Sequence, residues 1–238
     1  MSSAAPNIEV VALDRAEIAV EPWLWDFAVA RRAEIDRHFA HLRRERPALW
    51  NGRVLLLHRS AIRRGVLRGA CFETDYASFI AWRDWGFVDG NVANIFAVAA
   101  LQGADGGYLA GEMAPSTANA GQVNFPCGTP DPADVRSDGT LDLAGSLARE
   151  LFEETGIDIA TLEAETGWTM VHDRGYIAML KRVTAPQSAE ELRARIFRHL
   201  ARDEHPEFID IRVLRGRADL NAHVPAYLVA YLHKAWQG

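Results

Sequence analysis

Helical patterning or helix-capping residues mark five segments of the chain. In these segments apolar residues recur every three to four positions, or the flanking residues are of types that commonly begin or end helices. The segments are residues 23–47, 76–85, 143–155, 188–203 and 224–236. The central one follows Asp142, a favoured N-cap residue type, and precedes Gly156, a type common just past a helix C-terminus. Ser188 and Glu191 have the spacing of a capping box at the start of the next helix.

Strand-like segments rich in β-branched, aromatic and other apolar residues alternate with these helices. They are residues 8–13, 53–59, 65–73, 94–102, 106–113, 121–130, 162–173, 175–185 and 207–214. Strands that alternate with helices predict an α/β sandwich built on a mixed sheet. We expect an α+β subdomain, rich in strands, over residues 1–90 and a second domain over residues 91–238.

Composition narrows the class of protein. The 238 residues are 49% apolar and 24% charged, with a net charge of −6, so neither nucleic acid nor a membrane is an expected partner. Cys71 and Cys127 are too few to form a disulfide framework in a chain of this length. The start of the sequence lacks the pattern of a secretory signal, and we expect a cytoplasmic protein. The sequence predicts nothing about oligomeric state.

Three carboxylates gather near the end of the helix at residues 143–155. Glu150, Glu153 and Glu154 fall within an arc of roughly 100° on the helix surface. The neighbouring arc is expected to be buried against a sheet, and it contains Ala144, Leu147, Ala148, Leu151 and Phe152. Like charges at these spacings repel, and the negative end of the helix dipole adds to the cost. The cluster is either a solvated acidic face or a site for a hard divalent cation such as Mg²⁺.

The stretch RELFEETGI, residues 149–157, decides between these interpretations, together with the preceding FPCGTP. It resembles the helical half of the signature of the Nudix hydrolases, so we expect a Nudix-type α/β/α sandwich. The resemblance implies hydrolysis of a nucleoside diphosphate linked to another moiety, with Mg²⁺ or Mn²⁺ as cofactor. It implies Glu150, Glu153 and Glu154 as metal ligands and a catalytic role for Glu153. Arg149 would position the carboxylates, and Gly128 would place backbone amides near the phosphates.

Two departures from the family pattern affect the loop before this helix. The family has a Glu eight residues before the Arg, where this chain has Leu141. The loop 129–140 also carries about seven extra residues compared with the family spacing. The missing Glu supports the Arg in the family, and the candidates to replace it here are Asp142 and the loop residues Asp131, Asp134 and Asp138.

The substrate class is open at this level. RPALWNGRVLLL and TDYASFIAWRDWG resemble the layout of the Nudix branch that hydrolyses UDP-glucose and UDP-galactose, which implies a nucleotide-sugar substrate and the products NMP and sugar phosphate. The alternatives are a pyrophosphatase acting on ADP-ribose or coenzyme A, or a non-catalytic Nudix-fold module that binds or senses nucleotides.

Other residues are secondary candidates. Glu207, in a Pro-containing loop before a strand, is either an additional metal ligand or general base, or a solvated loop acid. Trp82 and Trp85 could stack a base, although core packing is the preferred interpretation. The Arg residues between 59 and 68 could attract a diphosphate, but a solvated hairpin is preferred. His172 and Asp173 are interpreted as a hairpin turn.

Overall fold

The computed structural model describes residues 8–47 and 49–237, so residues 1–7, 48 and 238 of the two expected domains lie outside the described residues. The helices are α1 (Asp26–Ala30), α2 (Arg32–Glu45), α3 (Tyr76–Asp84), α4 (Leu143–Thr155), α5 (Ala189–Leu200) and α6 (Ala226–Ala235). Three short 3₁₀ helices are η1 (Pro132–Asp134), η2 (Ile159–Thr161) and η3 (Arg217–Asp219). The strands are β1 (Glu9–Leu13), β2 (Arg15–Val20), β3 (Arg53–Arg63), β4 (Val66–Asp75), β5 (Asn94–Gln102), β6 (Tyr108–Met113), β7 (Val123–Asn124), β8 (Cys127–Gly128), β9 (Glu163–Ala164), β10 (Trp168–Asp173), β11 (Tyr176–Thr184) and β12 (Phe208–Leu214).

A nine-stranded mixed sheet forms the centre of the molecule. Its main order is β1-β10-β11-β5-β6-β12, and β11 runs parallel to β5 while the other neighbours are antiparallel. Strands β5 and β6 pair only at Gln102 and Tyr108. Beyond that pair they diverge, and β8 pairs with β5 while β7 pairs with β6. The sheet is therefore split on one side of its centre.

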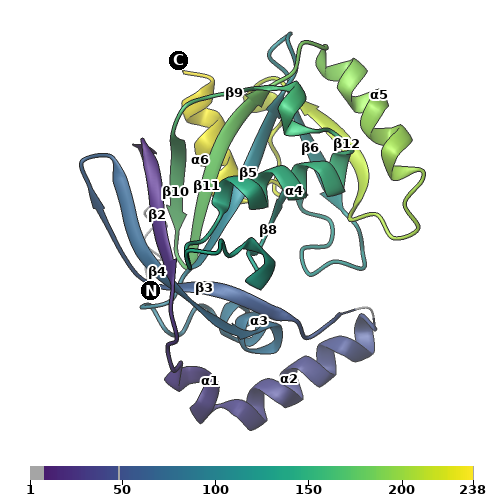
Figure 1. Cartoon of the computed structure of the whole chain (residues 1–238). Helices are drawn as coiled ribbons and strands as arrows, with labels where there is room; N and C mark the ends of the chain where they lie inside the picture. Colours follow the sequence, from purple (N-terminus) through teal and green to yellow (C-terminus); the bar gives the residue numbers. More distant parts are fainter. Residues whose placement is uncertain (1–7, 48, 238) are drawn as a thin grey trace, which may run out of the picture.

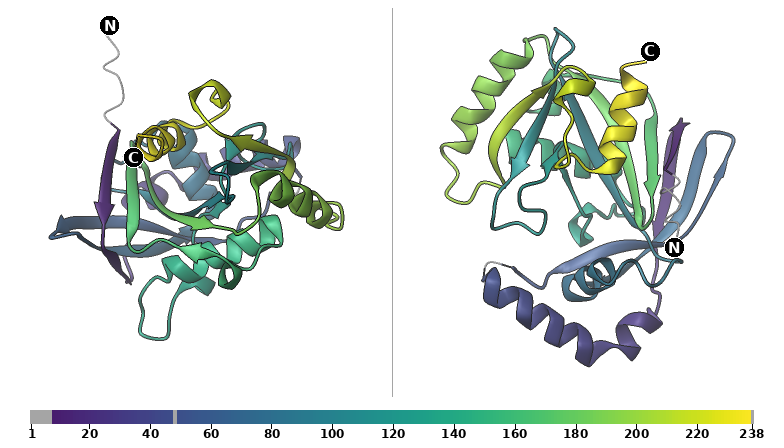
Figure 2. Two further views of the ribbon diagram at one scale, coloured as in Figure 1. Left: turned by 90° about the horizontal axis from the view of Figure 1, so that it is seen from above. Right: turned by 180° about the vertical axis from the view of Figure 1, so that it is seen from behind.

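Helices cover both faces of this sheet, which confirms the predicted α/β sandwich. In Figure 1, α4 and α5 lie in front of the sheet, and the view from behind in Figure 2 shows α6 on the opposite face. Alternate residues of β5 pack into the two hydrophobic cores, one on each face of the sheet, because successive side chains of a strand point to opposite faces. Ala97 and Ala99 pack with Leu147 and Leu151 of α4, whereas Phe96, Val98 and Ala100 pack with residues of α6.

The N-terminal part of the chain forms a second, three-stranded sheet in the order β2-β4-β3. One face of it packs into the core that α4 and α5 share with the large sheet, through residues such as Leu55 and Leu57. The helices α1, α2 and α3 lie together beside this small sheet (Figure 1). Strand β1 pairs with β10 and so belongs to the large sheet. The division into domains at residue 90 stays a prediction.

The structure differs from several local predictions. The predicted helix over residues 23–47 is interrupted at Arg31, whose backbone leaves the helical region (φ −112°, ψ 19°) while its guanidinium lies 4.4 Å from the Trp85 ring centre. The predicted strand over residues 121–130 is reduced to β7 and β8, because the split of the sheet leaves each only two residues to pair. Strand β2 was not predicted.

Within the described ranges, no helix has both the length and the apolar character to cross a bilayer.

Candidate active site

Helix α4 has the bounds and caps that the sequence predicts. The Asp142 side chain accepts a hydrogen bond of 2.8 Å from the backbone N–H of Gly145, which satisfies one of the free donors of the first turn. Gly156 ends the helix with φ +67°, a left-handed conformation that costs glycine little. Leu147 and Leu151 are buried against the sheet. The helix therefore holds its last turn, with its carboxylates, in a fixed place.

The buried face of α4 differs from the prediction. Phe152 is 55% exposed and Ala144 is also exposed, so their predicted burial is wrong. Glu154 is instead only 5% exposed and lies on the covered side of the helix. The reason is tertiary: β8 lies against α4 and covers the side that carries Glu154. One of the predicted metal ligands is therefore a buried carboxyl group.

Glu154 and Glu150 are destabilised as anions. The backbone N–H of Cys127 donates a 2.9 Å hydrogen bond to Glu154 Oε2. Burial raises the pKa of Glu154 well above its usual range, and the neighbouring Glu150 carboxylate adds to the shift. The pKa of Glu150 rises to about 7, chiefly by burial and further by the charges of Glu153 and Glu207. Raised carboxyl pKa values of this kind mark a site where several carboxylates lie close together without enough positive charge to balance them.

Gly128 lies directly against Glu150. A Cβ added to Gly128 would overlap the Glu150 carboxylate, so only glycine permits this close approach. The backbone of Gly128 is held in place because β8 pairs with Ala97 of β5. The structure therefore brings Gly128 against the acidic end of α4. Its expected place near the phosphates stays a prediction.

Arg149 connects the carboxylates of this site. Its guanidinium lies 2.8 Å from Glu150 Oε1 and 3.0 Å from Glu153 Oε2, and it donates hydrogen bonds of 3.1 and 3.2 Å to both oxygens of Asp134. Partial burial opposes the positive charge of Arg149, but the surrounding carboxylates outweigh that effect and raise its pKa. Arg149 is thus held as the cation between the loop and the helix.

Asp134 is the loop candidate that contacts Arg149. It is only 5% exposed and also accepts hydrogen bonds from Ser146 Oγ and from the backbone N–H of Asp131. The sequence contains a usable signal, since Asp131, Pro132 and Asp134 form the capping box of the short helix η1. Leu141 is buried in the core instead.

The three other candidates make no hydrogen bond or ion pair with Arg149. The Asp142 side chain caps α4 and forms an ion pair with Arg136. Asp131 caps η1 and accepts a hydrogen bond from the backbone N–H of Ala133. Asp138 is exposed, and its carboxylate accepts hydrogen bonds from the backbone N–H and hydroxyl of Thr140. One aspartate therefore reaches the arginine, and the other three serve local caps and turns.

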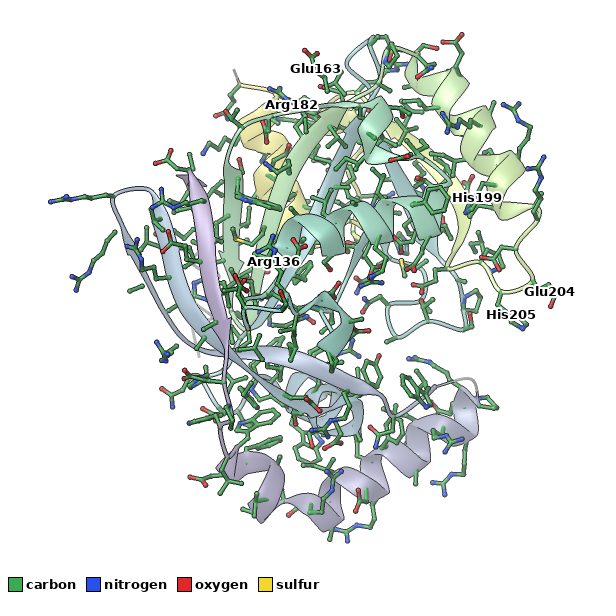
Figure 3. The ribbon with its side chains drawn as sticks, in the orientation of Figure 1. Arg136, Glu163, Arg182, His199, Glu204 and His205 are labelled. Carbon is green, nitrogen blue, oxygen red and sulfur yellow. The ribbon has the colours of Figure 1, made fainter. Side chains whose placement is uncertain are left out.

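Glu207 lies on the same side of the molecule as the α4 carboxylates. Partial burial raises the pKa of Glu207, and the charges of Glu153 and Asp203 add to the shift. Glu207 and Glu150 line one cavity. In contrast, Glu204 and His205 are exposed in the loop between α5 and β12, and Figure 3 shows them at the outer edge of that loop.

The donor set suits a hard divalent cation. Glu150, Glu153, Glu154 and Glu207 supply only carboxylate oxygens, and their mutual repulsion leaves negative charge that a cation would compensate. Within residues 8–47 and 49–237, no three His, Cys, Asp or Glu side chains are already arranged around one point. The guanidinium of Arg149 takes up part of this charge, because it contacts both Glu150 and Glu153.

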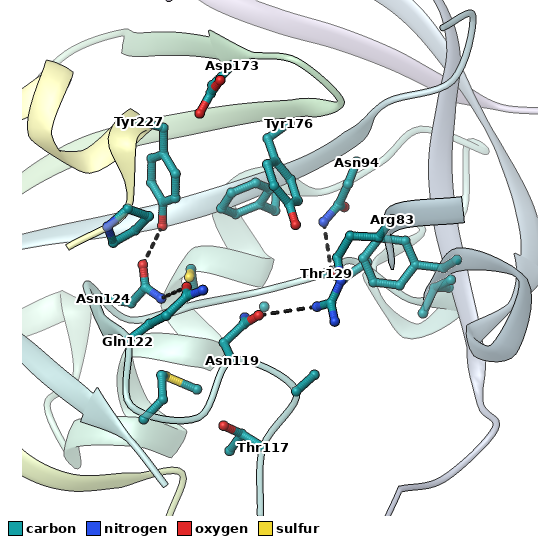
Figure 4. Close-up of a pocket in the computed structure, with 18 of the residues that line it drawn as sticks. Arg83, Asn94, Thr117, Asn119, Gln122, Asn124, Thr129, Asp173, Tyr176 and Tyr227 are labelled. Atoms are coloured by element: carbon teal, nitrogen blue, oxygen red, sulfur yellow. Dashed lines mark hydrogen bonds between the residues drawn. The ribbon is translucent and has the colours of Figure 1, made fainter. Parts of the chain in front are cut away.

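A cavity of about 770 Å³ opens beside these acids, at the split of the large sheet. Gly128, Glu150 and Glu207 form one end of its wall. The sequence did not point to most of the other residues that line it, among them Arg83, Asn94, Asn124, Asp173, Tyr176 and Tyr227 (Figure 4). The only signal for them is polar residues next to strongly apolar strands, as with Asn94 at the start of β5.

The hairpin interpretation of Asp173 is correct but incomplete. Asp173 is the last residue of β10 and pairs with Tyr176 of β11 across the hairpin. It is also only 5% exposed and lines the cavity. A turn aspartate would normally face solvent, so its burial makes it a candidate functional residue.

The secondary aromatic and basic candidates have mainly structural surroundings. Trp82 is fully buried among the aromatic residues beside the small sheet, as preferred from the sequence. Trp85 is half-buried and stacks with Arg31. Arg59 and Arg68 are exposed on the β3–β4 hairpin and form ion pairs with Glu21, just after β2, and Glu17, within β2, which agrees with a solvated hairpin.

Comparison with known proteins returned matches only among solved structures. No protein-family model and no curated protein matches the chain. The MutT protein from Methanosarcina mazei Go1 is 18% identical over 60% of this chain and 91% of that chain, with a TM-score of 0.39. A Nudix hydrolase from Nitrosomonas europaea is 18% identical over 61% and 88%, with a TM-score of 0.40. The Nudix hydrolase RenU from M. smegmatis is 14% identical over 60% and 82%, with a TM-score of 0.37. We therefore base the function on the site residues.

Proposed function

We propose that this protein is a divalent-metal-dependent hydrolase that cleaves the pyrophosphate of a nucleoside diphosphate linked to another moiety. The observation that carries the proposal is a pair of carboxylates at the end of α4. Glu150, whose side chain is 12% exposed, lines a large cavity and lies against Gly128, and Glu154, 5% exposed, accepts a hydrogen bond from the backbone N–H of Cys127. Buried anions of this kind destabilise a protein unless a ligand or cation compensates them, so they are characteristic of functional sites.

The residues that would hold the cation are Glu150, Glu153 and Glu154, with Glu207 as a further candidate. A bound Mg²⁺ or Mn²⁺ would neutralise pyrophosphate charge and favour attack on phosphorus. Asp134 positions Arg149, and Arg149 in turn orients Glu150 and Glu153. Gly128, whose backbone lies against Glu150, would bring its backbone amide near a phosphate group bound beside these acids.

The reaction adds water across the phosphoanhydride. Glu207 takes a proton from the attacking water, a role that its raised pKa favours because a stronger base accepts the proton more readily. The water oxygen bonds to one phosphorus, the P–O–P bond breaks, and the bridging oxygen leaves on the other phosphate. With a UDP-sugar, the finer candidate, the products are UMP and sugar 1-phosphate.

The test is a panel of nucleoside diphosphate compounds with Mg²⁺, with Mn²⁺ and with chelator, with products followed by ³¹P NMR. UDP-glucose, UDP-galactose, ADP-ribose and coenzyme A cover the competing substrate classes. Glu154→Gln is expected to remove metal-dependent hydrolysis while circular dichroism shows an intact fold. Glu163→Gln, on the exposed strand β9, is the matched control and should hydrolyse like the parent protein.

Absence of hydrolysis for every compound would refute the enzymatic proposal. Calorimetric binding of a nucleotide under those conditions would then favour the non-catalytic binding or sensor module. Equal turnover by Glu154→Gln and the parent at saturating Mg²⁺ would instead show that the α4 carboxylates are not the catalytic site.

A further inference from the structure

Two residues that line the cavity each carry a buried side-chain oxygen that accepts no hydrogen bond. They are Asn94 Oδ1 and Asp173 Oδ1, on side chains that are more than nine-tenths buried, and Arg174 Nε lies 3.6 Å from Asp173 Oδ1 as its ion-pair partner. In the part of the chain that the structure describes, Trp236 Nε1 is the one other side-chain atom in this condition, and it does not line the cavity. Buried polar groups are nearly always paired, so two open acceptors in one cavity indicate a ligand that pairs them.

These acceptors come from adjacent strand ends. Asn94 begins β5 and Tyr176 begins β11, and the two residues are register partners in the parallel pair. Asp173 pairs with Tyr176 in the β10–β11 hairpin. The backbone N–H of Asn94 donates a 2.8 Å hydrogen bond to the carbonyl of Gly175, which ties β5 to the turn of that hairpin. Figure 4 shows Asn94, Tyr176 and Asp173 along one wall of the cavity.

Strained backbone surrounds this wall. Arg174 follows Asp173 with φ +54°, and Phe87, whose ring centre lies 5.1 Å from that of Tyr176, has φ +59°. Non-glycine residues in this conformation raise the free energy of the fold by about 1–3 kcal/mol and cluster at ligand sites. Arg174 is the first residue of the two-residue β10–β11 turn, where hairpin turns require positive φ, so the positive φ of Phe87 is the feature here that the hairpin itself does not require.

Asn94 also connects the two ends of the cavity. Its Nδ2 donates a 3.1 Å hydrogen bond to the hydroxyl of Thr129, the residue that follows Gly128. With the amide held in this orientation, its Oδ1 is the atom left open. A ligand with a phosphate near Gly128 and Glu150 would therefore place its neighbouring chemical group beside Asn94 and Asp173.

We propose that Asp173 and Asn94 form a subsite that binds neighbouring hydrogen-bond donors on the non-phosphate part of the substrate. An ionised carboxylate and an amide carbonyl accept hydrogen bonds and cannot donate them, so the matching groups are adjacent hydroxyls of a sugar or the N–H edge of a base. The inference rests on the proposed function and specifies how that site selects its substrate.

The test compares the parent with Asp173→Asn on matched substrates. The first pair is a UDP-sugar and its deoxysugar analogue, and the second is a ribonucleotide and its 2′-deoxy form. The third pair is a nucleotide that carries uracil and the same nucleotide with another base. Asp173→Asn keeps the size of the side chain but places a donor where an acceptor was. We expect kcat/KM to fall about 10- to 100-fold for the donor-bearing substrate, mainly through KM, and the preference over the analogue to disappear. The pair that loses its preference identifies the sugar, the ribose or the base as the bound group.

Two controls separate recognition from folding. Without ligand, Asp173→Asn should melt at or above the temperature of the parent, because it removes a buried charge that lacks a full partner. Asn94→Leu is the second variant and should lose the same preference, whereas Glu163→Gln should keep it. An unchanged preference in both cavity variants would overturn the inference, and so would a lowered melting temperature of Asp173→Asn, since that result indicates a structural role.

Failure of the proposed function gives a different result. If the parent hydrolyses no member of the panel, the same variants are compared by calorimetric binding of the same nucleotide pairs. A donor-dependent loss of binding in Asp173→Asn then supports the subsite without catalysis. Equal binding of each pair by parent and variant overturns it.

Discussion

Asp134→Asn tests whether this loop aspartate, rather than a residue at position 141, holds Arg149. The variant keeps the shape of the side chain but removes its charge and turns one acceptor into a donor that faces the guanidinium. The Asp134 carboxylate is 4% exposed and makes two hydrogen bonds with Arg149, whose side chain is 35% exposed. A hydrogen bond to a charged group contributes about 1.5–3 kcal/mol, and solvent around Arg149 reduces that value. We expect the free energy of unfolding to fall by about 2 kcal/mol.

The same change should weaken cation binding. Arg149 would lose its partner on the loop and keep only Glu150 and Glu153, the carboxylates that are expected to bind the metal. Loss of a residue that orients metal ligands typically lowers metal affinity about 10- to 100-fold. We expect the affinity for Mn²⁺ to fall at least about 10-fold.

The assays are urea denaturation in chelator, followed by circular dichroism, and titration of free Mn²⁺ by electron paramagnetic resonance. Asp138→Asn is the matched control, because Asp138 lies in the same loop but is exposed and contacts Thr140. If Asp134→Asn equals Asp138→Asn in both stability and Mn²⁺ affinity, the assignment of Asp134 as the support of Arg149 is refuted.

Three further predictions concern α4 and its neighbours. Gly128→Ala should abolish hydrolysis in ³¹P NMR assays, because the new methyl group overlaps the Glu150 carboxylate. In chelator, the stability of the parent should decrease as pH rises from about 4.5 to about 7, since the folded pKa of Glu150 is raised from 4.5 to about 7 and the stabilisation present below 4.5 is lost. The free energy of unfolding should fall by about 3 kcal/mol at most over this pH range. Urea denaturation at several pH values should show a smaller pH dependence in Glu150→Gln than in the parent. Phe152→Ser should change stability by less than about 0.5 kcal/mol, because the Phe152 side chain is 55% exposed.

Each of these has an outcome that contradicts it. Full turnover in Gly128→Ala would show that the loop can move away from Glu150 without loss of function. The same pH dependence in Glu150→Gln and the parent would assign that dependence to other groups. A loss of more than about 2 kcal/mol in Phe152→Ser would mean that α4 buries the face predicted from the sequence.

Local sequence determined much of helix α4 and its acids. Asp142 and Gly156 set its ends, since capping hydrogen bonds and a left-handed glycine depend on residues within one turn. The spacing of Glu150, Glu153 and Glu154 on one side of the helix follows from helical geometry alone. The resemblance of RELFEETGI to a known signature added the expected chemistry.

Only the tertiary structure decided which side of α4 is covered. Sequence periodicity placed Phe152 on the buried face, but β8 lies against the opposite edge of the stripe and buries Glu154. Burial is a property of what packs against a helix, and that partner lies 27 residues away along the chain. The raised pKa values of Glu150 and Glu154 follow from this packing and are invisible in the sequence.

The cavity and the support of Arg149 also depend on long-range packing. Asp134 was one of several loop acids in the sequence, and the fold of η1 selected it by bringing it to Arg149. Asn94 and Asp173 are 79 positions apart and meet only because β5, β11 and β10 are neighbours in the sheet. The sequence by itself thus determined the local elements and the acidic cluster, while strand pairing decided which polar side chains share a cavity, because residues distant in the chain become neighbours only when the sheet forms.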